Sequence, residues 1–334
     1  MATKKKAAPK GAKRKKAPAG KTSIGADLKK ALLGVVILAA IVAVAGVVAH
    51  YTIGPEGRPP AARPEATPPH KSVPLDKPHP SAAAYKVPEF EIFPAQEPPP
   101  KPAVRAVDPG QGRPRVAIII DDMGYDRKVA DRFCTLDAPL TFSVLPSSPF
   151  RDAVVQKARS KGFSLMLHLP MEPNEYPDVD PGPGALLADM DPDRLLAVLE
   201  KNLDAVPYAI GVNNHMGSRL SAQADRMNQI FTVLKRRRLF YVDSRTTYHT
   251  KAHQAARLLQ VPFAQRDVFL DNDQTPEAIR AQIRQLSTLA VRHGEAVGIG
   301  HPHPVTFEVL REMLPELKSK VLLVPIAELV HPIS

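Results

Sequence analysis

Cysteine and tryptophan are almost missing from this chain of 334 residues, which has one cysteine, Cys134, and no tryptophan. A single cysteine excludes a disulfide within the chain, so cysteine usage favours neither an oxidising nor a reducing compartment.

Acidic residues are scarce at the start, because residues 1–30 hold 11 Lys and Arg but only one acid, Asp27. The rest of the chain holds 34 of the 45 basic and 33 of the 34 acidic residues, so its net charge is close to zero. We therefore expect no nucleic-acid partner for the folded part.

Charged residues are also absent between Ala31 and Ala49 (ALLGVVILAAIVAVAGVVA). As a helix this run would be about 28 Å long, close to the hydrocarbon thickness of a bilayer. Since basic residues precede it, the positive-inside rule predicts a cytoplasmic tail at residues 1–30 and an inner-membrane, single-pass anchor at 31–50. The C-terminal domain would then be periplasmic or otherwise extracytoplasmic. A cleaved signal peptide is the alternative, although the run is longer than a usual signal h-region.

Residues 51–114 are rich in proline, and 17 of the 36 prolines lie between Gly54 and Pro114. Such a segment buries too little apolar surface to offset chain entropy, which predicts a disordered, semi-extended linker. Residues 115–334 are then left for one well-packed domain.

Short apolar runs alternate with amphipathic stretches in this last part of the chain. The run VAIII at 116–120 is typical of a strand buried on both faces. The alternation predicts a parallel sheet, and the number of repeats favours an irregular α/β barrel of about seven strands. Further strands are expected at 140–145, 164–169, 209–213, 239–243, 263–270, 296–299 and 321–324, with helices between them.

Polar residues that can bind a metal or move a proton follow many of the expected strands. In a parallel barrel the carboxyl ends of the strands meet on one face, where the active sites of such barrels lie. Aspartate and neutral histidine suit a divalent transition metal, with zinc as the default. Such a metal lowers the pKa of a bound water, and a neighbouring carboxylate can accept the proton. The residues expected on this face are Asp121, Asp122, His168, Asn213, Asn214, His215, Asp243, Ser244, Arg245, Asp271, His301 and His303.

Several of these residues lie in segments that resemble the divergent polysaccharide deacetylase family. The segments are IIIDDMG (118–124), LTFSVLP (140–146), HLPMEP (168–173), NNHMGSR (213–219), YVDSRT (241–246) and GHPHP (300–304). The resemblance implies an irregular barrel related to the carbohydrate esterases of the NodB-homology type. It also implies a metal-dependent deacetylase that acts on N-acetylated glycans of the bacterial envelope, such as peptidoglycan or an exopolysaccharide.

The same resemblance implies roles for individual residues. Asp121 would be the proton-accepting base and Asp122 a metal ligand, while His301 or His303 would be the general acid. For Asp243 and Arg245 a structural ion pair is the alternative to substrate binding, and for Arg219 a bond to a backbone carbonyl. The residues expected to face the substrate are Asn214, Arg219, Asp243 and Arg245.

The spacing of the ligand histidines departs from the family pattern. The relatives have two ligand histidines four residues apart, whereas Glu172 stands four residues after His168 here. His215 is the best-placed second imidazole, which predicts a ligand set of Asp122, His168 and His215. Glu172 or His303 is the alternative third ligand. Because of this departure, a catalytically inactive module that binds envelope glycan or protein is the alternative function.

Overall fold

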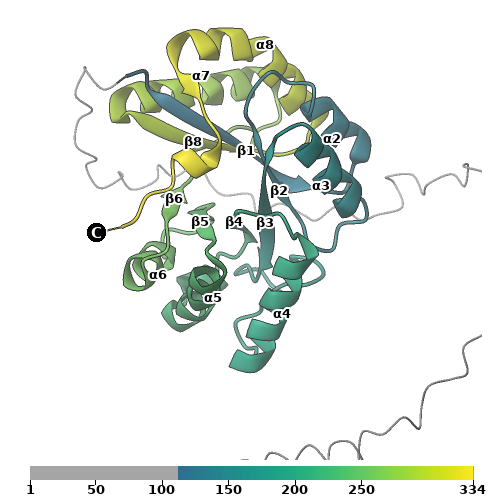
Figure 1. Ribbon diagram of the computed structural model, residues 1–334, viewed down its shortest axis with the longest axis vertical. Coiled ribbons are helices and arrows are strands. Elements are labelled where there is room, and N and C mark those ends of the chain that lie inside the picture. The colour runs from purple at the N-terminus through teal and green to yellow at the C-terminus, as the bar shows by residue number, and fades with distance from the viewer. Residues whose placement is uncertain (1–111, 334) are drawn as a thin grey trace, which may run out of the picture. The chain divides into compact units, whose positions relative to one another are not determined.

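The structure is a computed structural model that describes residues 112–333. In these residues a nine-stranded parallel sheet has the strand order β6-β5-β4-β3-β2-β1-β8-β7, with β9 paired to β1. Helices cover the outside of the curled sheet (Figure 1). The strands are β1 (Arg115–Met123), β2 (Thr141–Val144), β3 (Ser164–Met171), β4 (Gly211–Met216), β5 (Phe240–Asp243), β6 (Phe263–Gln265), β7 (Val268–Phe269), β8 (Glu295–Gly300) and β9 (Leu322–Leu323).

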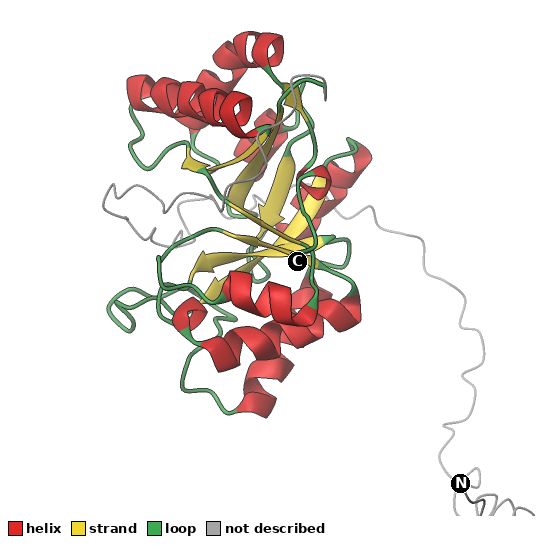
Figure 2. Cartoon of the chain, turned by 90° about the vertical axis from the view of Figure 1, so that its left-hand side faces the viewer, coloured by secondary structure: helices red, strands yellow, loops and turns green. Residues whose placement is uncertain are grey.

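The helices follow the strands in the alternation that the sequence predicts, and their ends show familiar start signals. Asp191 caps the helix that begins at Pro192, and Thr275 caps the helix that begins at Pro276. Figure 2 shows these helices on both sides of the strands. The helices are α2 (Arg127–Phe133), α3 (Arg151–Ser160), α4 (Pro192–Ala205), α5 (Ala224–Arg237), α6 (Ala252–Leu259), α7 (Pro276–His293) and α8 (Pro304–Lys320), with 3-10 helices η2 (Leu220–Ala222) and η3 (Ile326–Glu328).

The two edges of the sheet are joined by a very short piece of chain. Strand β6 pairs with β5, β7 pairs with β8, and only Arg266 and Asp267 separate β6 from β7. The Arg266 amide donates to the Asp243 carbonyl at 2.9 Å, and the Asp267 amide donates to the Val297 carbonyl at 2.8 Å. The chain thus crosses from one edge to the other within two residues, so the sheet curls into a half-barrel.

This crossing corrects one of the expected strands. The segment 263–270 is two strands rather than one, because its hydrogen bonds change from the β5 side to the β8 side at residues 266–267. The parallel α/β architecture itself is confirmed. The tail, anchor and linker expected at residues 1–114 lie outside the described residues, apart from residues 112–114. Within 112–333, no helix is both long and apolar enough to cross a bilayer.

Side chains that point into the curl form a small apolar cluster. The next inward positions along β1, β3, β4 and β8, at the carboxyl ends of the strands, are polar, since successive side chains alternate between faces. Inside the curl, a layer of apolar side chains therefore lies directly below the polar side chains at the carboxyl ends of the strands. The cluster consists of Ala117, Ile119, Met166, Phe240, Val242, Ala264, Val297, Ile299, Val324, Ile326 and Leu329.

Gly124, which follows β1, provides a test of how tightly this end of the sheet is packed. Its φ is +121°, and a Cβ atom there would lie 1.9 Å from Ser148 Oγ. We expect Gly124→Ala to lower the free energy of unfolding by about 3 kcal/mol, because strain adds to the displacement of Ser148. Gly162→Ala is the matched control, with φ of +76° and no atom within 4 Å of the added Cβ. Urea unfolding of both variants measures the difference, and equal losses would contradict the packing argument.

Candidate metal centre and catalytic site

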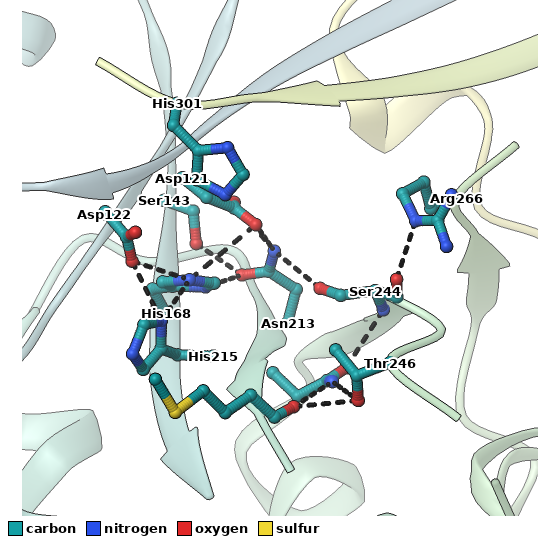
Figure 3. A network of polar contacts seen from close by, with 12 residues as sticks. Asp121, Asp122, Ser143, His168, Asn213, His215, Ser244, Thr246, Arg266 and His301 are labelled. Atoms are coloured by element: carbon teal, nitrogen blue, oxygen red, sulfur yellow. Dashed lines mark hydrogen bonds and ion pairs between the residues drawn. The ribbon is translucent and has the colours of Figure 1, made fainter. Parts of the chain in front are cut away.

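Three side chains bring potential ligand atoms together at the carboxyl ends of β1, β3 and β4 (Figure 3). Asp122 Oδ1 lies 3.1 Å from His168 Nε2 and 2.9 Å from His215 Nδ1. The two ring nitrogens are 3.3 Å apart. Tetrahedral coordination with bonds of about 2.1 Å separates neighbouring ligand atoms by roughly 3.4 Å. The three atoms, which we call the ligand triangle, therefore have nearly the spacing that one zinc-sized cation requires.

The ligand triangle is buried, and its carboxylate lacks hydrogen-bond partners. Asp122 is 2% exposed, His168 2% and His215 4%. Neither oxygen of Asp122 has a hydrogen-bond partner among the described residues, although two ring nitrogens lie close to Oδ1. A buried carboxylate in this state is costly unless a positive charge compensates it. One carboxylate and two imidazoles also form a donor set that suits zinc, so the residues fit a divalent cation.

The electrostatics of the ligand triangle also favour added positive charge. Burial raises the pKa of Asp122, but His215 and His168 outweigh burial and hold this pKa well below its usual range. Burial lowers the pKa of His168, but the carboxylates of Asp121 and Asp122 outweigh it and raise this pKa. Both shifts mean that the cluster stabilises positive charge, which either a proton or a divalent cation can supply.

An irregularity in β1 brings both aspartates to the same place. Neighbouring residues of a regular strand point to opposite faces. Here the pairing of β1 with β2 shifts between Ile120 and Met123, and Asp122 has a positive φ of 52°. As a result His168 Nε2 lies 3.7 Å from Asp121 Oδ2 as well as 3.1 Å from Asp122 Oδ1. The bulge lets one aspartate join the ligand triangle while the other stays beside it.

Asp121 is buried and is held by a neutral partner. It is 1% exposed, and the Asn213 amide donates to its two oxygens at 2.8 and 2.9 Å. Burial is the largest influence on its pKa and raises it, against the opposing effects of His168, His301 and the Asn213 hydrogen bond. A carboxylate whose pKa is raised is a stronger proton acceptor once ionised. Asn213 was only one of the polar residues expected on this face, and no role was predicted for it.

His301, the expected general acid, lies at this face and is held by Asp271. His301 Nδ1 lies 2.8 Å from Asp271 Oδ1, and the His301 amide donates to Asp271 Oδ2 at 2.7 Å. The Thr306 hydroxyl also donates to Asp271 Oδ2, at 2.7 Å. Burial lowers the pKa of His301, but Asp271 outweighs burial and raises it to about 9. His301 therefore carries a proton at neutral pH, as a general acid must.

His303 differs from His301 in both surroundings and charge. Its Nε2 lies 3.2 Å from Gln274 Nε2, and its pKa is lowered, chiefly by burial. Asp271, His301 and His303 also place one ligand atom each within 4.8 Å of one another. However, the Asp271 oxygens already accept two side-chain bonds and a backbone bond. We therefore interpret Asp271 and His301 as a carboxylate–imidazole pair, with Asp271 a functional residue to which no separate role was assigned from sequence.

The Asp271–His301 pair makes a prediction about pH dependence. If protonated His301 is required, activity is lost as the pH rises through its pKa of about 9. Asp271→Asn removes the charge that raises this pKa, so the alkaline limb of the kcat/KM profile should move to lower pH. Asp267→Asn, which alters a carboxylate that lies before β7 and accepts a bond from the Val297 amide, should leave the limb in place. An alkaline limb that stays fixed in Asp271→Asn would rule out His301 as the acid.

Asn214 has a different position from the one expected. It is 1% exposed, and its Oδ1 accepts bonds from Tyr241 Oη at 3.1 Å and the Ser244 amide at 2.9 Å. Its Nδ2 donates to the Met216 carbonyl at 2.8 Å and to Thr246 Oγ1 at 3.3 Å. The whole amide is used inside the fold, which corrects the expectation that Asn214 faces the substrate. Its role is to hold the loops that follow β4 and β5.

Arg219 and Glu172 are paired with each other. Arg219 Nη1 lies 2.8 Å from Glu172 Oε1, and Glu172 Oε2 accepts a bond from the Ala188 amide. Glu172 thus holds the loop after β3 and is not part of the ligand triangle, which corrects its proposed place as an alternative ligand. The partner of Arg219 within the described residues is a carboxylate rather than a backbone carbonyl, and substrate binding by its half-exposed side chain stays a prediction.

Asp243 and Arg245 organise the loop after β5. Asp243 is 2% exposed and accepts bonds from the Arg245 amide at 2.8 Å and from Thr250 Oγ1 at 2.9 Å. The Arg245 side chain donates to Gln265 Oε1 at 2.9 Å instead. The two side chains form no ion pair in the part of the chain that the structure describes, so the expected structural ion pair is corrected. Asp243 is committed to its loop, while substrate binding by half-buried Arg245 stays a prediction.

Comparisons with other proteins show the family to which the chain belongs. The family model described as divergent polysaccharide deacetylase matches residues 118–330. The uncharacterized protein YibQ of Escherichia coli is 34% identical over 217 residues, which cover 65% of this chain and 67% of that protein. An uncharacterized protein of Haemophilus influenzae is 31% identical over 215 residues, which cover 64% and 76% of the two chains.

One solved structure supports the fold independently. The crystal structure of an uncharacterized protein from Agrobacterium tumefaciens has a TM-score of 0.64 and 24% identity. It covers 66% of this chain and 91% of that one. Because the family model spans most of the described domain, the resemblance seen in the sequence is confirmed: the chain belongs to the divergent polysaccharide deacetylase family.

Proposed function

We propose that the domain is a divalent-metal-dependent deacetylase of N-acetylated glycans in the bacterial envelope. The observation that carries the proposal is the ligand triangle, whose atoms lie 2.9–3.3 Å apart and include the buried carboxylate of Asp122, which among the described residues only the two imidazoles approach. Two groups suited to proton transfer, Asp121 and His301, lie at the same face (Figure 3). Membership of the family supports an acetylated glycan as the substrate class.

The chain's own residues divide the chemistry of amide hydrolysis between them. A divalent cation, zinc by default, would polarise the acetyl carbonyl and lower the pKa of a bound water. Asp121, held through both oxygens by Asn213, would accept the proton of that water. His301, held protonated by Asp271, would give a proton to the leaving amine. The burial of Asp121 excludes bulk water and strengthens these charge interactions.

The alternative, an inactive binding module, was favoured by the missing histidine four residues after His168. That argument loses its weight because His215, from the neighbouring strand β4, lies 3.3 Å from His168. An imidazole from a different strand can complete a ligand set as well as one on the same strand. We therefore treat binding without catalysis as an outcome of the test rather than as an equal proposal.

The envelope location is also a proposal, and it rests on the apolar run at residues 31–49. An anchor there, at residues 31–50, would place the barrel outside the cytoplasm, where peptidoglycan and exopolysaccharide lie. Protease treatment of intact spheroplasts gives the answer. Degradation of the domain from outside is expected, and full protection until lysis would contradict the proposed location.

The function is tested by metal content and by acetate release on the same preparation. Purified full-length protein should contain roughly one divalent ion per chain. It should release acetate from chitooligosaccharides or from peptidoglycan, stop after chelation and recover when the metal is restored. Metal-free protein that binds peptidoglycan but never releases acetate would decide for the binding module. Release of a different acyl group would show that another bond is cleaved.

A further inference from the structure

Asn213 connects the ligand triangle with the carboxylate beside it. It lies on β4, two residues before His215, and is 0% exposed. Its Nδ2 donates to both oxygens of Asp121, at 2.8 and 2.9 Å. Its Oδ1 lies 2.9 Å from His168 Nδ1 (Figure 3). One side-chain amide therefore contacts both the expected base and an expected metal ligand.

The orientation of this amide is determined by its neighbours. A carboxylate can only accept hydrogen bonds, so the amide must turn its NH₂ group to Asp121 and its oxygen away. The Ser143 hydroxyl donates to Oδ1, and Ser244 Oγ lies 3.3 Å from Nδ2 on the opposite side. Turning the amide over would place an oxygen against two carboxylate oxygens, which is repulsive.

The amide orientation in turn determines the tautomer of His168. Since Oδ1 of Asn213 is an acceptor, neutral His168 forms this hydrogen bond only with its proton on Nδ1. The lone pair of Nε2 is then free, and Nε2 is the atom that faces Asp122 and His215. In metal sites the second ring nitrogen of a ligand histidine usually has a partner of this kind, which fixes the ring.

We propose that Asn213 is a positioning residue that prepares His168 to bind the cation and at the same time orients Asp121 for proton transfer. The inference rests on the proposed function, since it assigns roles within that site. Because the amide is neutral, it orients Asp121 without adding a positive charge beside the cation. An aspartate at position 213 would retain the acceptor for His168 but would place a second negative charge beside Asp121.

The tautomer can be measured directly in full-length, metal-free protein. Nitrogen-15 shifts of the His168 ring, recorded at a pH where the ring is neutral, distinguish a proton on Nδ1 from one on Nε2. We expect the Nδ1–H form in the wild type and a mixture of both forms in Asn213→Leu. Zinc affinity, measured by calorimetry, should fall about 10- to 100-fold in this variant. Asn202→Leu is the matched control, because Asn202 on α4 is also buried but donates to the carbonyl of Gly184, in the loop before that helix.

An exchange of the two partners tests whether the hydrogen bonds, rather than the identity of the residue at position 213, prepare His168. In Asp121→Asn/Asn213→Asp the carboxylate at 213 can accept from His168 Nδ1–H and from the amide at 121. We expect the Nδ1–H form and zinc affinity to return to within about 3-fold of the wild type, while acetate release stays lost. A role confined to packing would instead leave the His168 tautomer unchanged in Asn213→Leu, because leucine fills a similar volume without offering the acceptor.

The outcomes distinguish this inference from the proposed function. If wild-type protein binds zinc and releases acetate, but Asn213→Leu has the same tautomer and affinity, the role of Asn213 is overturned. Failure of the double exchange to restore zinc affinity in a folded protein would overturn it as well. If the wild type binds no divalent ion and releases no acetate, the proposed function fails, whatever the tautomer.

Discussion

Asp122→Asn is expected to abolish acetate release and to weaken binding of a divalent ion by more than the roughly 100-fold that loss of an outer partner costs. The reason is that Asp122 supplies the only negative charge of the ligand triangle among the described residues. An amide at this position leaves two imidazole nitrogens 3.3 Å apart with no anionic ligand between them to balance a cation. Calorimetric titration with zinc and elemental analysis of the purified variant measure the loss.

The control for this variant is a second buried aspartate at the end of a strand. Asp243 is 2% exposed, as Asp122 is, but it bonds to the Arg245 amide and to Thr250. Asp243→Asn should bind zinc as the wild type does, so a general disturbance of the sheet is separated from loss of a ligand. If Asp122→Asn retained wild-type affinity, the ligand triangle would not be the metal site.

Asp121→Asn is expected to bind the divalent ion and yet to lose about 10²- to 10⁴-fold in kcat, the usual contribution of a general base. The Asn213 amide can still donate to the oxygen of an asparagine at this position, so the local contacts survive. KM should change little, because Asp121 is proposed to move a proton rather than to bind substrate. Steady-state acetate release and metal content, measured in parallel, give both numbers. Loss of metal together with activity would make Asp121 a ligand instead.

The same aspartate predicts the acidic limb of the pH profile in the wild type. Burial raises the pKa of Asp121 above that of an ordinary aspartate. The base must be ionised, so kcat/KM should rise with pH through this pKa, at a higher pH than an exposed aspartate would give. The Asp271–His301 pair then sets the fall on the alkaline side.

Much of the site could be predicted from the sequence because parallel strands align their carboxyl ends. Asp122, His168 and His215 are separated by long stretches of chain, yet each stands at the end of a recognisable apolar run. Strand pairing β1–β2–β3–β4 then brings them to one face. The local bulge at Asp122 could not be predicted, since its positive φ depends on the pairing of β1 with β2.

The place of Asn213 was missed although the sequence contains the signal. Alternation along β4 puts Asn213 and His215 on one face and Asn214 on the other. Since residues two apart on a strand share a face, the position of His215 predicts that Asn213 faces the site and that Asn214 does not. The pairing of Arg219 with Glu172 had no such signal, because it depends on how two loops meet.

In the proposed mechanism, ion binding and proton donation come from separate stretches of this domain. The ligand triangle is complete by His215 on β4, whereas Asp271 and His301 belong to the last third of the domain. We therefore expect a single substitution at His301 to give a stable protein that still binds the ion but releases no acetate. In related chains, the same proposal requires the three ligands for binding of a cation, and the late aspartate and histidine as well for turnover.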